Sequence, residues 1–212
     1  MHDTDASGFH RIMFFSDAII AIAITLLALD LRLPEPAPSL AAYQLPQYLR
    51  SMIERFWSFA LSFIVIAIYW DAHHRLFHFL RRHDRSLVWL NFGFLFFIVL
   101  LPLPTALIGT YPHFSLANAL YTCTVAYLGV LCTMIWLYVA RRHDLLKTDP
   151  EGQRLTLIEG LWGLSGPLLF VASIPVVFVS TDAAHALWGV TALVPIAAHL
   201  HAKRLRRRRF AS

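Results

Sequence analysis

Polar side chains lie inside a long apolar stretch near the start of this sequence, and they are the first candidates for chemistry. Residues 11–32 form a run long enough to cross a bilayer, which takes about 20 mainly apolar residues. Ser16 and Asp17 lie one or two turns inside it, where a carboxylate is costly unless it is paired or has a function. We favour a buried network of Arg11, Ser16 and Asp17 that locks this segment to its neighbours. An interfacial cap, in which the acid pairs with a nearby base, and direct ion contact are alternatives. The candidate partners at the same depth are Trp70, His73, His74 and Asn91.

A histidine cluster follows the second apolar run, and its chemistry suggests metal binding, proton sensing or a basic belt. Its members are His73, His74, His78 and His83. His74 and His78 are four residues apart, so they share a helix face. Membrane-bound di-iron hydroxylases need several such histidine boxes with added acids, and this chain has one cluster. We therefore interpret the cluster as a basic belt at the membrane surface, with pH sensing as the alternative, since histidine titrates near neutral pH.

One face of the first apolar run carries bulky aliphatic side chains at helical spacing. At about 100° per residue, Ile22, Leu26 and Leu29 fall within one stripe together with Phe15, and Thr25 lies at its edge. By periodicity alone such a stripe faces lipid or the protein core, and the alternative is an apolar constriction that controls the wetting of a pore. Asp30 is either an acid at the outer mouth of a pore, where it attracts cations, or a solvated residue at a helix end.

Composition excludes a water-soluble domain of this length. Of the 212 residues, 58% are hydrophobic, and the mean hydropathy is +0.58. The net charge of +5 comes from short basic clusters between apolar runs, so we expect no nucleic-acid partner. The cluster at residues 203–209 instead fixes topology or contacts anionic lipid. Cys123 and Cys132 fall on opposite faces of one predicted helix, and they form neither a disulfide framework nor a zinc motif.

These patterns predict a polytopic all-α protein, with residues 1–212 forming one transmembrane domain. The six predicted helices are at about 11–32, 52–73, 86–108, 116–140, 155–179 and 183–202. The proline-rich residues 33–47 predict a loop, and Pro102 and Pro104 predict a bend or break in the third helix. Six helices place both termini on one side of the membrane. Most lysines and arginines then fall on that side, so the positive-inside rule places both termini in the cytoplasm.

Three motifs in the first half of the chain match one known family. They are Arg11-x-x-x-Phe15-Ser16-Asp17, Tyr69-Trp70 with His73-His74-x-x-Phe77, and Leu101-Pro102-Leu-Pro104-Thr105. With these motifs the chain resembles the transmembrane protein 175 family, which includes the lysosomal potassium channel and its prokaryotic relatives. The resemblance covers the first three predicted helices, and the last three agree with the family in number and length.

The resemblance implies a potassium-preferring cation channel in a prokaryotic inner membrane, built as a homotetramer whose first helix lines the pore. It implies a pore constriction at Ile22, Leu26 and Leu29, a role for Thr25 in selectivity, and a structural role for the signature that includes Phe15. It implies no cofactor beyond permeant potassium ions, and its partners are further copies of the chain and membrane lipid. The alternatives are a secondary transporter and a membrane-embedded enzyme that uses the histidine belt.

Overall fold

The main elements of the protein are all helices. The computed structural model describes residues 2–31, 45–146 and 165–190. The elements are α1 (His2–Leu27), the 3-10 turn η1 (Ala28–Leu31), α2 (Leu45–Phe79), α3 (Arg85–Leu100), α4 (Pro102–Thr110), α5 (Ser115–Arg141), the 3-10 turn η3 (His143–Leu145) and α7 (Ser165–Val179). Residues 181–190 are also helical. Parts of the predicted fifth and sixth helices, at 155–164 and 191–202, and the basic cluster at 203–209 lie outside the described residues.

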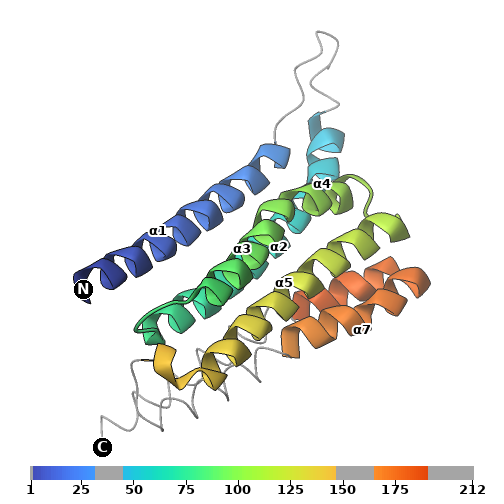
Figure 1. The fold of residues 1–212 in the computed structure, drawn as a ribbon. Helices are drawn as coiled ribbons and strands as arrows, with labels where there is room; N and C mark the ends of the chain where they lie inside the picture. Colours follow the sequence, from blue (N-terminus) through green and yellow to red (C-terminus); the bar gives the residue numbers. More distant parts are fainter. Residues whose placement is uncertain (1, 32–44, 147–164, 191–212) are drawn as a thin grey trace, which may run out of the picture.

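The helices form a bundle with α5 in contact with several of the others (Figure 1). α5 packs against α3, α4 and α7, whereas α1 lies at one side of the bundle against α2 and α3. Four segments of the described residues are long and apolar enough to cross a bilayer. They are His10–Leu27, Met52–Phe77, Arg85–Thr110 and Ser115–Arg141. The described part of the chain therefore has the architecture of a multi-pass membrane protein.

Prolines determine two of the helix boundaries. The predicted break in the third helix is confirmed, because α3 ends at Leu100 and α4 begins at Pro102. A proline has no amide hydrogen to donate, but the first turn of a helix leaves those donors without an intrahelical acceptor anyway. The same reason explains α2, which begins at Leu45 with Pro46 in its first turn. The predicted loop at 33–47 is therefore wrong at its last three positions.

The first helix also differs from its predicted bounds. α1 begins at His2 rather than near residue 11, and after Leu27 it gives way to the 3-10 turn η1 rather than continuing to residue 32. Extending a helix that already exists costs little, because nucleation is the unfavourable step. The polar residues before the apolar run can therefore continue the helix without being part of the membrane span.

A polar cluster ties the turn between α2 and α3 to the end of α5. Asp84 caps α3 by accepting a 2.8 Å hydrogen bond from the Leu87 amide, and it also accepts a hydrogen bond from the Tyr138 hydroxyl. The guanidinium of Arg142 lies 3.4 Å from the same carboxylate. Partial burial raises the pKa of Asp84, but these hydrogen bonds and the nearby arginine lower it further, so its pKa lies below the usual value. The cluster thus stabilises the charged form of the cap.

Two glycines in the same span provide a matched test of helix packing. A Cβ at Gly109 on α4 would lie 2.6 Å from Oγ of Ser58 and 3.2 Å from the Cα of Arg55, both on α2. At Gly93 on α3 the nearest atom, in the Leu131 side chain, is 3.7 Å away. Gly109→Ala should therefore push α4 from α2 and cost about 1–3 kcal/mol, as overpacking does.

Gly93→Ala makes the same chemical change without a clash, and it gains roughly 0.5–1 kcal/mol of helix propensity. We expect the unfolding temperature in detergent, followed by circular dichroism, to fall for Gly109→Ala and to hold or rise for Gly93→Ala. Equal unfolding temperatures for the two variants would contradict the close packing of α4 on α2.

Candidate functional site on the first helix

α1 carries two apolar faces that have different surroundings. The side chains that face the core are Ile20, Ala23 and Leu27, each 1% exposed. The predicted stripe lies on the other side of the helix, where Ile22 is 59% exposed, Leu29 48% and Leu26 39%. One face of α1 is therefore packed against α2 and α3, and the stripe has no cover from the described residues of the chain.

Hydrogen bonds in series join α1, α2 and α3 at one depth. Nε2 of His73 donates to Oδ1 of Asn91 over 2.8 Å, because an amide oxygen can only accept. The Asn91 amide nitrogen donates to Oγ of Ser16 over 2.9 Å, and Ser16 donates to the backbone carbonyl of Ile12 over 2.9 Å. His73 and Asn91 are 2% exposed, and Ser16 is 0% exposed. The series gives these buried polar groups the partners that an apolar environment cannot provide.

Aromatic rings hold His73 in this position. Its imidazole stacks on Phe77, with ring centroids 4.2 Å apart, and on Phe94, with centroids 5.2 Å apart. Nδ1 of His73 is buried and has no hydrogen-bond partner among the described residues. This arrangement suits a ring with one proton, on Nε2, because a second proton would need an acceptor. His73, which was both a candidate partner in the network and a member of the histidine cluster, thus belongs to the interhelical network rather than to a surface belt.

A second contact between α1 and α2 lies closer to the surface. Nε1 of Trp70 donates to Oδ1 of Asp17 over 2.9 Å, and the Trp70 ring stacks on His74 with centroids 5.3 Å apart. Trp70 is 39% exposed, so this contact is only partly shielded from its surroundings. Arg11 makes no hydrogen bond or ion pair with any residue that the structure describes. Of the charged residues in the signature, Asp17 therefore contacts α2 and Arg11 stays outside the network.

The remaining predicted site residues lie along the exposed side of α1. The Phe15 ring meets that of Phe92 on α3 edge to face, with centroids 5.9 Å apart. Oγ1 of Thr25 donates to the backbone carbonyl of Ile22 over 2.7 Å, so this exposed hydroxyl is bonded within its own helix. Asp30 lies in η1, and its side chain is outside the described residues.

The described members of the histidine cluster show no arrangement for metal binding. Among the described side chains, no three histidine, cysteine, aspartate or glutamate residues are grouped so that they could hold a metal ion. The side chain of His78 lies outside the described residues, and His74 stacks on Trp70. The described geometry therefore gives no support to the metal interpretation of this cluster.

A second buried polar group, which the sequence analysis missed, links α2, α4 and α5. Oγ of Ser62 lies 2.8 Å from Oγ1 of Thr105 and 3.2 Å from the Tyr121 hydroxyl. Ser62 and Tyr121 are 0% exposed, and Thr105 is 2% exposed. Single hydroxyls on helices commonly bond to their own backbone, so their spacing carries no signal for such contacts. The one sequence feature that pointed to this group was Thr105, which directly follows Pro104 in the segment Pro102-Leu103-Pro104.

The fold and this site define a helical membrane protein whose first helix is anchored on one face and uncovered along an apolar stripe on another. Residues 11–102 match the family model for TMEM175, described as the endosomal/lysosomal potassium channel TMEM175. A Chryseobacterium protein named potassium channel is 38% identical over 145 residues, which cover 68% of this chain and 69% of the relative. A potassium channel of Streptomyces collinus is 31% identical over 195 residues, which cover 86% of this chain and 89% of the relative. The chain belongs to the TMEM175 family.

A solved structure is similar over nearly the whole fold. It is the crystal structure of a lysosomal potassium-selective channel TMEM175 homolog from Chamaesiphon minutus, with a TM-score of 0.76 and 27% identity, and it covers 88% of this chain and 95% of that chain. The family and these relatives are ion channels and not enzymes, which removes the enzyme alternative for the histidine belt.

The buried series of hydrogen bonds predicts a clear order of stability effects. Asn91→Leu should lower the unfolding temperature in detergent most, because it leaves the Nε2–H of His73 buried without an acceptor, at about 1–3 kcal/mol. It also removes the donor to Ser16, which keeps its bond to the carbonyl of Ile12. Ser16→Ala leaves only the Asn91 amide unpaired and should cost less. Trp70→Phe removes a partly exposed hydrogen bond and serves as the control. If Asn91→Leu unfolds at the wild-type temperature, Asn91 does not hold the three helices together.

Proposed function

We propose that this protein is a potassium-preferring cation channel of a prokaryotic inner membrane, in which four copies surround a pore lined by α1. Each copy would contribute one domain of six transmembrane helices, with both termini in the cytoplasm. The observation that carries the proposal is the uncovered stripe of Ile22, Leu26 and Leu29 on a helix whose other face is anchored. The bacterial relatives are named potassium channels, and we take the proposed permeant ion from those names.

The stripe would act as the constriction of the pore. With four copies around one axis, each of the three positions would form an apolar ring, and such rings control passage by wetting and drying. Taking a cation out of water costs several kcal/mol. A pore that is dry along its whole length would therefore not conduct, and the open state must be wider and wetter at Ile22. Small changes in the tilt of α1 would suffice to move between the two states.

Thr25 is the polar group closest to this stripe, and its geometry suits contact with a cation. Its hydroxyl proton is donated to the carbonyl of Ile22. The lone pairs of Oγ1 are then left to accept, and oxygen ligands are those that hard cations prefer. We assign Thr25 a role in selectivity on this basis. Asp30, the residue directly after Leu29, would attract cations to the outer mouth of the pore.

The polar network beside the stripe would hold α1 rather than contact the permeant ion. Ser16 and Asp17 bond to residues of α3 and α2, on a different face from Ile22. Four α1 helices can form rings only if each keeps the same rotation about its own axis. The network fixes that rotation, and so it would support the pore from outside the ion path. Phe15 would add an aromatic contact with α3 at the same end.

A bi-ionic reversal potential tests the proposal directly. Purified protein in planar bilayers, with potassium on one side and sodium on the other, should give a potassium-preferring current. Ile22→Asn places a polar group in the proposed constriction, so it should increase the current or change the ratio of potassium to sodium permeability by severalfold. Val130→Asn on α5 is the matched control, since Val130 is 40% exposed and lies outside the proposed pore.

The outcomes separate the three parts of the proposal. A wild-type current that does not prefer potassium would contradict the selectivity, and no current from folded protein would contradict the channel. A current that changes equally in Ile22→Asn and Val130→Asn would contradict the assignment of the pore to α1.

A further inference from the structure

A small pocket lies at the end of the bundle where α4 gives way to α5. Its volume is about 210 Å³. The described residues that line it come from the first turns of the α2 span, from α4 and the turn after it, and from the helix at residues 181–190. Drug-sized ligands fill pockets of about 300–1,000 Å³, so this pocket suits a smaller molecule.

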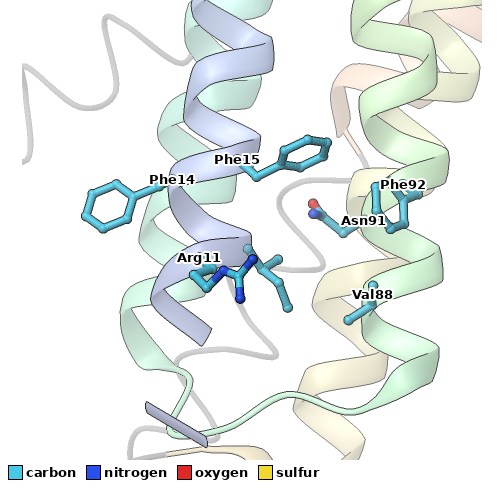
Figure 2. A pocket seen from close by; sticks show the side chains of 7 residues that line it. Arg11, Phe14, Phe15, Val88, Asn91 and Phe92 are labelled. Atoms are coloured by element: carbon cyan, nitrogen blue, oxygen red, sulfur yellow. The ribbon is translucent and has the colours of Figure 1, made fainter. Parts of the chain in front are cut away.

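A larger cleft, between α1 and α3, belongs instead to the site already described (Figure 2). Arg11 and Phe15 line this cleft. At 100° per residue, both fall within about 20° of Ile22 on the helix. The cleft therefore opens on the face that the proposed function turns toward the pore. The small pocket shares no lining residue with it and has none on α1.

One part of the pocket wall is apolar and includes an indole ring. Trp57 on α2 is 53% exposed, and its ring reaches the helix at residues 181–190 at Gly189, where an added Cβ would lie 3.7 Å from Cζ2 of Trp57. The other apolar residues of the wall are Ile53, Leu61, Ile108 and Pro112. A ligand can therefore bury apolar groups here, and a cation against the indole ring gains a cation–π attraction.

Some of the polar groups in the pocket already have partners within the protein. The polar residues that line it are Glu54, Ser58, His113, Asp182 and His185. Oγ of Ser58 donates to the backbone carbonyl of Arg55 over 2.9 Å. Nε2 of His185 donates to Oδ1 of Asn118 over 2.7 Å, because an amide oxygen can only accept. These two contacts leave the carboxylates as the main polar groups for a ligand.

The two carboxylates lack strong partners among the described residues. None of those residues forms a hydrogen bond or an ion pair with Glu54, which is close enough to His185 to interact with it electrostatically. Oδ1 of Asp182 lies 3.9 Å from Nδ1 of His113, and these side chains are 83% and 73% exposed. So long and exposed a pair is weak, and Asp182 can exchange it for another partner. The ligand must therefore be a cation.

The donor set does not suit an inorganic cation. Hard metal ions take six or more oxygen ligands, or keep a shell of water that an apolar wall cannot replace. Among the described side chains, no three histidine, cysteine, aspartate or glutamate residues are grouped so that they could hold a metal ion. An ammonium group with alkyl substituents matches both parts of the pocket, since its charge meets the acids and its carbon atoms meet the apolar wall.

We propose that this pocket binds an organic ammonium group, with its charge on the carboxylates of Glu54 and Asp182 and its apolar substituents against Trp57. Because no lining residue belongs to α1, the site does not depend on the proposed pore. The bound cation would join α2 to the helix at residues 181–190. A small soluble cation and the headgroup of an ethanolamine lipid both present this chemistry.

Equilibrium dialysis of the purified protein with radiolabelled choline, at constant ionic strength, tests the site. The wild type should bind choline saturably, and 3,3-dimethyl-1-butanol, a neutral isostere of choline, should compete poorly. Trp57→Leu should weaken choline binding about two- to fivefold, because the cation–π attraction is lost. Glu54→Gln should weaken it severalfold, and adding Asp182→Asn should reduce the affinity for choline to that for the neutral isostere.

Asp71→Asn and Trp89→Leu are the matched controls. Asp71 is an exposed acid at the other end of α2, and Trp89 on α3 is 65% exposed. Both variants should bind choline as the wild type does, and circular dichroism verifies that each variant is folded. The proposal is overturned if the wild type shows no saturable binding, if the neutral isostere competes as well as choline, or if the control variants lose as much affinity as Glu54→Gln and Trp57→Leu. Displacement of choline by potassium chloride but not by sodium chloride would also overturn it, since the acids would then bind an inorganic cation.

A second arm of the experiment identifies the source of the ammonium group. Choline binding would be measured in nanodiscs of phosphatidylglycerol alone and of phosphatidylglycerol mixed with phosphatidylethanolamine. Binding that falls in the mixture, and does so in the wild type but not in Asp182→Asn with Glu54→Gln, assigns the pocket to the lipid headgroup. Equal binding in the two kinds of nanodisc assigns it to a soluble cation.

Discussion

The structure depends on one buried amide that needs a partner at each end. Asn91 accepts from His73 on α2 and donates to Ser16 on α1, and all three side chains are buried inside the protein. In hydrocarbon, each unsatisfied polar group costs several kcal/mol. Ser16 can reach Asn91 in only one rotation of α1, because a shift of a single residue turns a side chain by about 100°. The amide therefore fixes α1 about its own axis as well as against its neighbours.

That rotation determines what the rest of α1 presents to its surroundings. With Ser16 facing α3, the face that contains Ile20 and Leu27 packs into the core, and the stripe that contains Ile22 and Leu29 is left uncovered. The same rotation leaves Arg11 exposed on the side of the stripe, where it makes no hydrogen bond or ion pair with any described residue. Anchoring and a proposed pore surface are thus two consequences of one orientation.

Sequence reasoning predicted the parts of this arrangement that depend on depth and on local chemistry. An all-helical membrane protein followed from the apolar runs, and the break before Pro102 followed from the missing amide hydrogen. Position along the helices was enough to group Ser16, Asn91 and His73. It was not enough to separate them from Arg11, because pairing depends on the rotation of each helix and on neighbours that are distant in the sequence. The contact of Ser62 with Thr105 and Tyr121 escaped notice for the same reason.

The most direct test of the proposed orientation of α1 is the accessibility of a cysteine on its stripe from inside a conducting pore. In a chain whose Cys123 and Cys132 are replaced by alanine, Ile22→Cys would be compared with Val130→Cys in planar bilayers. Silver ions bond tightly to thiolates, which are soft ligands. The orientation proposed here predicts that silver irreversibly blocks the potassium current of Ile22→Cys and leaves that of Val130→Cys unchanged. A current through Ile22→Cys that silver does not affect would contradict a pore lined by α1.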